Sequence, residues 1–274
     1  MAIALFALGL FVMETRWENA SPTAPTPDAA EVSRQELAIE TGRLMSAAQA
    51  NPQFQSLTPL ASTWQELLGG IWIPWKEEVP QGQENPVIDT AATAHDAQSL
   101  VNELNKFSLD VHKIGDDGAQ AQLTTSISAS TQILAARLAA NTGVPLSIST
   151  PIPTTISQLV PDAESLKRIE MARQWIELKT AQTPAPARGS LPEVIAFLDQ
   201  VISLAIDRGV PDSRPALTLP AANTEAAELL AKEFISMSAN ANLEQRQALS
   251  LTIAYIYAIT SAETPSTPGY IATR

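Results

Sequence analysis

The two histidines and the glutamates are the first side chains to consider for chemistry. A di-metal site in a helical bundle needs a glutamate from each of two helices and a Glu-x-x-His pair from each of two others, because one helix face must present an oxygen and an imidazole together. His95 and His112 are the two histidines, and neither lies three residues after a glutamate. We therefore predict no metal ligand and no cofactor from the sequence.

Glutamates outside such a pattern are interpreted as solvent-exposed helix faces, because charged residues are rarely buried without a partner. Those expected to contact water in this way are Glu36, Glu40, Glu103, Glu164, Glu170, Glu177, Glu225, Glu228 and Glu233. None of them is predicted to bind a ligand.

Nucleophilic catalysis is the next possibility, because serine and threonine are plentiful. A serine nucleophile needs an adjacent base and a group that orients the base. The chain has no Gly-x-Ser-x-Gly sequence, and His112 is expected to be a partly buried helix residue, not a general base. No glycine-rich phosphate-binding sequence precedes a helix either. We predict no catalytic residue and expect that the protein is not an enzyme.

Trp72 and Trp75 flank Pro74 in a segment outside any clear helix. Exposed tryptophans in a loop are candidate contacts for a partner protein or for the membrane interface. The alternative is that both indoles fold back and close one end of a helical bundle. The sequence leaves both interpretations open.

Charge and cysteine content exclude several classes of protein. Lys plus Arg is 17 and Asp plus Glu is 29, which gives a net charge of −12. A chain of this sign without a basic run repels phosphate backbones, so we predict no nucleic-acid partner. The absence of cysteine excludes disulfides, iron–sulfur clusters and cysteine-ligated zinc.

The N-terminal segment Ala2–Met13 is apolar throughout. It is shorter than the ~20 residues that a bilayer-spanning helix needs, but it matches the apolar region of a signal sequence. We predict a membrane segment or signal anchor over residues 1–17 and a disordered linker over residues 18–29. A frayed or core-buried first helix is the alternative. Whether the segment is cleaved, or whether the true start lies upstream, is left open.

The first part of the folded chain is predicted to be an irregular helical region over residues 30–150. Helices are expected over residues 30–50, 57–68, roughly 100–114 and 119–141, each ending at a glycine or proline break. The third is the clearest, because apolar residues follow one another at spacings of three and four. This stripe consists of Leu100, Leu104, Phe107, Val111 and Ile114.

A helical bundle is predicted over residues 151–264, after the proline-rich connection of residues 144–159. Its helices are expected from Pro161, over 191–208, over 224–239 and over 243–261. Ser190 and Glu193 are predicted to form a capping box at the start of the second. The last helix has almost no polar face and should be the most buried. Residues 265–274 are predicted to be a flexible tail.

The layout of residues 161–270 resembles a family of actinobacterial proteins of unknown function that carry a ferritin-like four-helix domain. The resemblance rests on the helix Leu191–Arg208, on Gly209, on the loop Pro215–Pro220 and on the closing Pro268–Gly269. Members often read Pro-Ala-Tyr-Asp-Leu-Pro at this loop, whereas Leu217 replaces the aromatic residue here. The resemblance implies a ferritin-like fold and no known activity, and the Glu/His-rich opening helix of the family is missing.

These observations predict an all-α protein, an antiparallel helical bundle of possible ferritin-like four-helix type behind an N-terminal membrane segment. The leading functional hypothesis is a scaffold or protein-interaction module at the cell membrane. Its bundle is expected on the extracytoplasmic side, with another envelope protein as partner. The second hypothesis is binding of a small apolar or lipid ligand between helices, favoured by the Ala/Leu/Ile-rich interior. A metal-dependent ferritin-like enzyme is the third. The partner, the oligomeric state and the membrane orientation are not specified by the sequence.

Overall fold

The computed structural model describes residues 26–115, 118–146, 149–212, 214, 216, 225–261 and 263–270, and every regular element in these ranges is helical. The prediction of an all-α fold is therefore confirmed for the described part of the chain. The predicted membrane segment of residues 1–17 lies outside it, as do residues 18–25 of the linker. Among the described helices, none has the length and hydropathy needed to cross a membrane.

The helices follow the predicted order closely. The first half of the chain contains α2 (Ala29–Ala50), η1 (Pro52–Phe54), α3 (Leu57–Leu67), α4 (Ala97–Asp110), η2 (Val111–Ile114) and α5 (Gly118–Thr142). The second half contains α6 (Pro153–Ser157), α7 (Ala163–Gln182), η3 (Ala185–Ala187), α8 (Leu191–Asp207), α9 (Ala226–Ser238) and α10 (Leu243–Thr260).

Side-chain caps explain where several helices begin. Asp28 and Asp162 each accept a hydrogen bond from the backbone N–H three residues ahead, and Asp96 and Asn242 form complete capping boxes. The predicted capping box of Ser190 and Glu193 at the start of α8 is wrong. The helix starts at Leu191 as expected, but the Ser190 side chain makes no capping hydrogen bond.

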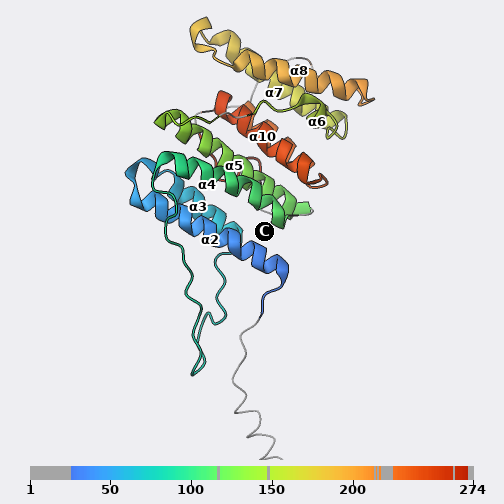
Figure 1. Ribbon diagram of the computed structural model, residues 1–274. Helices are drawn as coiled ribbons and strands as arrows, with labels where there is room; N and C mark the ends of the chain where they lie inside the picture. Colours follow the sequence, from blue (N-terminus) through green and yellow to red (C-terminus); the bar gives the residue numbers. More distant parts are fainter. Residues whose placement is uncertain are drawn as a thin grey trace, which may run out of the picture.

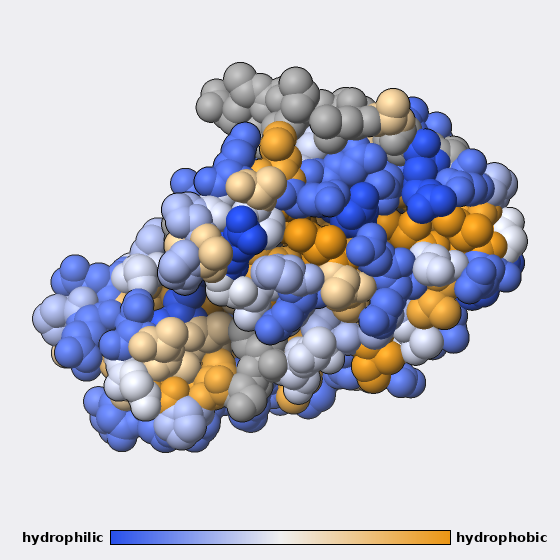
Figure 2. All heavy atoms as spheres, turned by 90° about the horizontal axis from the view of Figure 1, so that it is seen from above, coloured by the Kyte–Doolittle hydropathy of each residue, from blue (hydrophilic) through white to orange (hydrophobic). Residues whose placement is uncertain are grey.

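The helices stack in layers (Figure 1). α2 packs on α3, α4 on α5, α5 on α10, and α7 on both α8 and α9. Viewed from the α8 end, the surface is mostly hydrophilic with apolar residues between the charged ones (Figure 2). Residues 68–96 between α3 and α4 form no regular element and extend away from the helices.

Two hydrophobic cores lie along this stack. The N-terminal core runs from Leu37 to Ala139 and includes the predicted stripe on α4, while the C-terminal core runs from Ala129 to Tyr257. Helix α5 belongs to both, because Ile127 and Leu134 face the first core and Ala129 and Ile133 the second. This helix is therefore buried on two sides.

Residues 263–270, which we call the C-terminal strap, lie across α5 and α3. Buried Ser126 and Ser130 of α5 donate hydrogen bonds to the carbonyls of Pro268 and Pro265, and the indole N–H of Trp64 donates to Ser266 O at 2.8 Å. Residues 265–270 of the predicted flexible tail therefore make defined contacts with α5 and α3, and the prediction of flexibility itself stays a prediction.

Gly269 fits this strap because it has no side chain. A Cβ placed on it would lie 2.3 Å from the carbonyl carbon of Ala231, and its φ of +73° is one that other residues rarely adopt. The strap is therefore held against α9 as well as against α5.

Candidate functional site

A groove of about 940 Å³ lies between the start of α3, the start of α4 and the C-terminal half of α5. We call this hollow the groove. Its apolar wall consists of Phe54, Leu57, Pro59, Leu60, Leu100, Leu104, Leu134 and Leu138. Its polar lining consists of Gln53, Ser56, Arg137, Asn141, Thr142 and Thr264. One side of the groove is thus apolar, and hydrogen-bonding groups and one cation line the rest.

Helical spacing places these leucines. Leu100 and Leu104 lie four residues apart on α4, as do Leu134 and Leu138 on α5, so each pair points the same way. The capping box of Asp96 with Ser99 fixes the start of α4 one turn before Leu100. The walls of the groove are therefore built on rigid elements.

Arg137 is the cation in the groove, and its guanidinium is held by Ser261 at the end of α10 and by Thr264 of the strap. One terminal nitrogen donates to Thr264 Oγ1, and the other donates to the carbonyl of Ser261 at 2.9 Å. Burial lowers the pKa of Arg137, and the negative charge of Glu263 partly opposes this effect. The side chain is therefore anchored by neutral acceptors while part of its charge is desolvated.

A second candidate is a buried polar cluster where η2, α5 and α10 meet. Ser250 Oγ lies 3.4 Å from His112 Nε2 and 3.2 Å from Ser128 Oγ, and Gln132 donates to both serines. His112 Nδ1 has no hydrogen-bond partner among the described residues. Burial, together with the positive charge of Arg246, lowers the pKa of His112 to about 4.

This cluster places a serine hydroxyl beside an imidazole nitrogen, as a catalytic serine–histidine dyad does, but its surroundings differ from those of an active site. Within the described part of the chain, no carboxylate orients the imidazole through Nδ1, whereas a catalytic triad requires such a group. Ser250 and His112 are 0% and 1% exposed, so a substrate cannot reach either side chain. We interpret the cluster as the polar part of the junction between the two cores.

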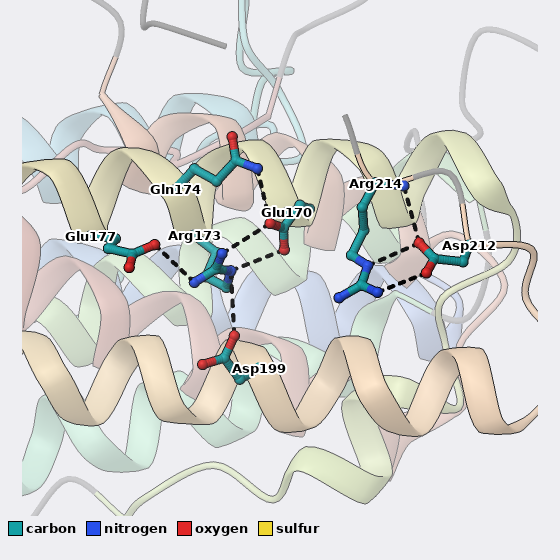
Figure 3. Close-up of polar contacts among 7 residues, drawn as sticks. All are labelled: Glu170, Arg173, Gln174, Glu177, Asp199, Asp212 and Arg214. Carbon is teal, nitrogen blue, oxygen red and sulfur yellow. Dashed lines mark hydrogen bonds and ion pairs between the residues drawn. The ribbon is translucent and has the colours of Figure 1, made fainter. Parts of the chain in front are cut away.

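A third cluster of charges joins α7 to α8 (Figure 3). Arg173 donates two hydrogen bonds of 2.9 Å to Glu170, and it also lies 3.2 Å from Glu177 and 3.3 Å from Asp199. Gln174 donates to Glu170 as well. The hydrogen bond to Glu170 raises the pKa of Arg173. These groups satisfy one another, which favours a structural role.

The same view shows a separate pair near Glu170, in which Arg214 donates to both oxygens of Asp212 at 2.9 and 2.7 Å. This pair is on the surface, and its hydrogen bonds lower the pKa of Asp212 to about 2.

Two glutamates predicted to be solvent-exposed are in fact buried. Glu170 and Glu233 are each 5% exposed, and each is paired with an arginine, Arg173 and Arg168 respectively. The ion pairs explain why the prediction of exposure was wrong, because a carboxylate that is hydrogen-bonded to a guanidinium can be buried. Within the described ranges, no three His, Asp or Glu side chains are grouped as a metal ion would require.

Trp72 and Trp75 are both partly buried and belong to neither core. Gln35 exchanges two hydrogen bonds with the backbone of Trp72, at 2.8 and 3.1 Å, and Asn85 does the same for Trp75, at 3.1 and 2.9 Å. The segment is therefore held in place by side-chain amides. Both interpretations of the indoles, as contacts or as a plug, stay predictions.

The groove was not predicted from the sequence, although part of its signal was present. Leu134 and Leu138 lie four residues apart in the helix expected over residues 119–141, and Arg137 lies between them on the same face of the 3.6-residue repeat. An arginine inside a leucine stripe is a signal that could have been used. Thr264 and the groove's other walls come from distant parts of the chain.

Comparisons with protein-family models, with curated proteins and with solved structures gave no match for this chain. The resemblance of residues 161–270 to a ferritin-like family therefore stays a prediction. The argument for function that follows rests on the geometry of the groove.

Proposed function

We propose that this protein binds a small apolar molecule in the groove between α3, α4 and α5. The observation that carries this proposal is a volume of about 940 Å³ walled by leucines on three rigid elements. Small-molecule sites have volumes of about 300–1,000 Å³ and mostly apolar walls with a few polar groups. The other hollows near the cores are smaller or lined with several acids, such as the pocket of about 340 Å³ that contains Glu36, Glu40 and Asp110.

The free energy of such binding would come from removing apolar surface from water. Burial of each methylene contributes about 0.8 kcal/mol, so a ligand that covers the leucines gains more with each carbon until the groove is full. Leu100 and Leu104 are already fixed by the N-terminal core, so little order is lost when the ligand binds.

Displacement of a neutral fluorescent probe tests this proposal. Phenylnaphthylamine should bind to the wild-type chain, and Leu60→Trp should weaken its binding by about tenfold or more, because the indole fills the groove. Leu60 packs only partly against the core, so the larger side chain has room. Leu243→Trp is the matched control, because Leu243 is 47% exposed and lies outside the groove.

Two results would contradict the proposal. The first is no saturable binding of the probe to the folded wild-type protein. The second is equal binding to wild-type and Leu60→Trp proteins when both have the same thermal stability.

The scaffold at the cell membrane is a second proposal, which the segment of residues 68–96 favours. This segment extends from the helices and carries Val87, which is 99% exposed, together with the partly buried Trp72 and Trp75. Replacing both tryptophans with alanine should remove a specific crosslinked partner in cells while the midpoint of thermal unfolding stays constant. A large drop in that midpoint would indicate a plug instead.

A further inference from the structure

The charge of the groove is opposite to that of the whole protein. The chain carries 29 acidic and 17 basic side chains, yet among the described residues that line the groove Arg137 is the one charged group. A pocket of about 620 Å³ on the other side of the strap is lined by Glu225, Glu228 and Glu263 together with Lys232. The described groove wall, with one cation and no acid, differs from that pocket in the sign of its charge.

Arg137 keeps its charge available for a ligand. Its two hydrogen-bond acceptors, Thr264 Oγ1 and Ser261 O, are neutral. The negative charge of Glu263 acts on Arg137 from nearby, but none of the ion pairs found among the described residues includes Arg137. A guanidinium has five donors, so several hydrogen atoms of Arg137 remain for other acceptors. A carboxylate matches a guanidinium in charge and shape and can accept two parallel hydrogen bonds from it.

The start of α3 adds a second positive feature. Ser56 and Leu57 line the groove at the first turn of this helix, and the hydroxyl of Ser56 makes no capping hydrogen bond. The N-terminus of a helix carries a partial positive charge, which favours a negative group in its vicinity.

From this arrangement we infer the chemical class of the ligand, an inference that rests on the function proposed above. The structure assigns to the groove a single-chain amphiphile with one carboxylate head. The alkyl chain lies against the leucines of α3, α4 and α5, and the carboxylate accepts hydrogen bonds from Arg137. One guanidinium balances one negative charge, so in a protein of net charge −12 a monoanion is favoured over a phosphate dianion.

Four ligands that share one alkyl chain test this assignment on the full wild-type protein. Their dissociation constants are measured by displacement of phenylnaphthylamine and by calorimetry. Dodecanoate should bind about tenfold or more tightly than 1-dodecanol, because a charge-assisted hydrogen bond forms in a partly desolvated site. Dodecyltrimethylammonium and dodecyl phosphate should both bind more weakly than dodecanoate.

The variants locate the head group. Arg137→Gln should remove the preference for dodecanoate over dodecanol, and Arg137→Lys should restore much of it. Arg208→Gln is the matched control, because Arg208 also donates to a backbone carbonyl, that of Ser157, but lies outside the groove. If Arg137→Gln does not fold, the ranking of the four ligands on the wild-type protein decides the question alone.

Failure of this inference can be distinguished from failure of the proposed function. Equal affinities for dodecanoate and dodecanol would overturn the carboxylate assignment while apolar binding stands. Tighter binding of dodecyl phosphate, or an unchanged dodecanoate preference in folded Arg137→Gln, would overturn it too. If none of the four ligands displaces the probe or binds to the wild-type protein, both proposals fail.

Discussion

The two hydrophobic cores differ in how completely their helices close around them. The C-terminal core is joined across α7 and α8 by the Arg173 ion pairs, its Phe197 and Tyr255 pack edge to face at 6.3 Å, and the pockets beside Trp175 and Tyr257 have about 200 and 620 Å³. The N-terminal core has its own stacked pair, Trp64 and Phe107, yet it leaves a groove of about 940 Å³ at one end.

This difference indicates which part of the molecule serves stability and which serves function. Leucines that line an open groove lack the contacts that leucines in a filled core have, so the protein loses packing energy there. A ligand can supply the missing contacts. We therefore expect mutations in the C-terminal core to change stability, and mutations around the groove to change binding more than stability.

The largest expected effect comes from a matched pair of leucines. Leu198 in the C-terminal core is 0% exposed, and Leu198→Ala should lower the free energy of unfolding by about 3 kcal/mol or more. Leu138 is 9% exposed in the groove wall, and Leu138→Ala should cost about 1 kcal/mol, because water can already enter the space beside it. Chemical denaturation measures both, and equal losses would contradict the contrast between the cores.

The second expected effect is the pH dependence of the junction between the cores. The pKa of His112 is lowered to about 4 in the folded protein, whereas a free histidine has a pKa of about 6.5. Between these two pKa values, His112 is protonated in the unfolded chain but neutral in the folded protein. The free energy of unfolding therefore falls as the pH falls. The loss between pH 7 and pH 5 should be about 2 kcal/mol.

His112→Asn should abolish this loss, as followed by urea denaturation at each pH. His95→Asn is the control for replacing a histidine, since His95 is exposed. A flat wild-type profile over this range would show that His112 is not held neutral. Asp96 and Asp162 do not titrate in the range from pH 5 to pH 7, because hydrogen bonds from Ser99 and Ser165 lower the pKa values of these carboxylates.

The third effect concerns the ion pairs of the C-terminal core. Glu170→Gln should lower the free energy of unfolding by about 1.5 kcal/mol, because a buried charged acceptor for Arg173 is lost while Asp199 remains. Glu177→Gln removes a contact of the same arginine, but Glu177 is 61% exposed, so its effect should be close to zero. Similar losses for the two variants would show that burial does not strengthen the Glu170 pair.

The helices were predictable from the sequence because their signals are local. Leu100, Leu104, Phe107 and Val111 follow the helical period, and all four are buried. Glycine and proline breaks marked the ends of most helices within a few residues. The long-range features were not predictable in this way, since the groove joins α3, α4, α5 and Thr264, which are far apart in the chain.

The burial of α5 could not be predicted from its residue types, because many of its buried side chains are polar. Its completely buried hydroxyl residues are Thr124, Thr125, Ser126, Ser128, Ser130 and Thr131. Threonines in a helix can satisfy their own hydroxyls, as Thr125 and Thr131 do by donating to the carbonyls of Ala121 and Ile127. Serines 126 and 130 instead bind the strap, so a tail that its composition marks as flexible is fixed by a helix far away in the sequence.

The smallest predicted effect tests this attachment of the strap to α5. Ser130→Ala removes a buried hydroxyl and leaves the carbonyl of Pro265 without its donor, so the free energy of unfolding should fall by about 1 kcal/mol. Ser33→Ala is the control, because the Ser33 hydroxyl also donates to a carbonyl, that of Ala29, but at an exposed helix surface. Pro265 follows Thr264, which lines the groove, so loss of the hydrogen bond to Pro265 should also displace Thr264. Ser130→Ala should therefore change dodecanoate affinity while Ser33→Ala does not, and if both variants bind it as the wild type does, the strap contributes to stability alone.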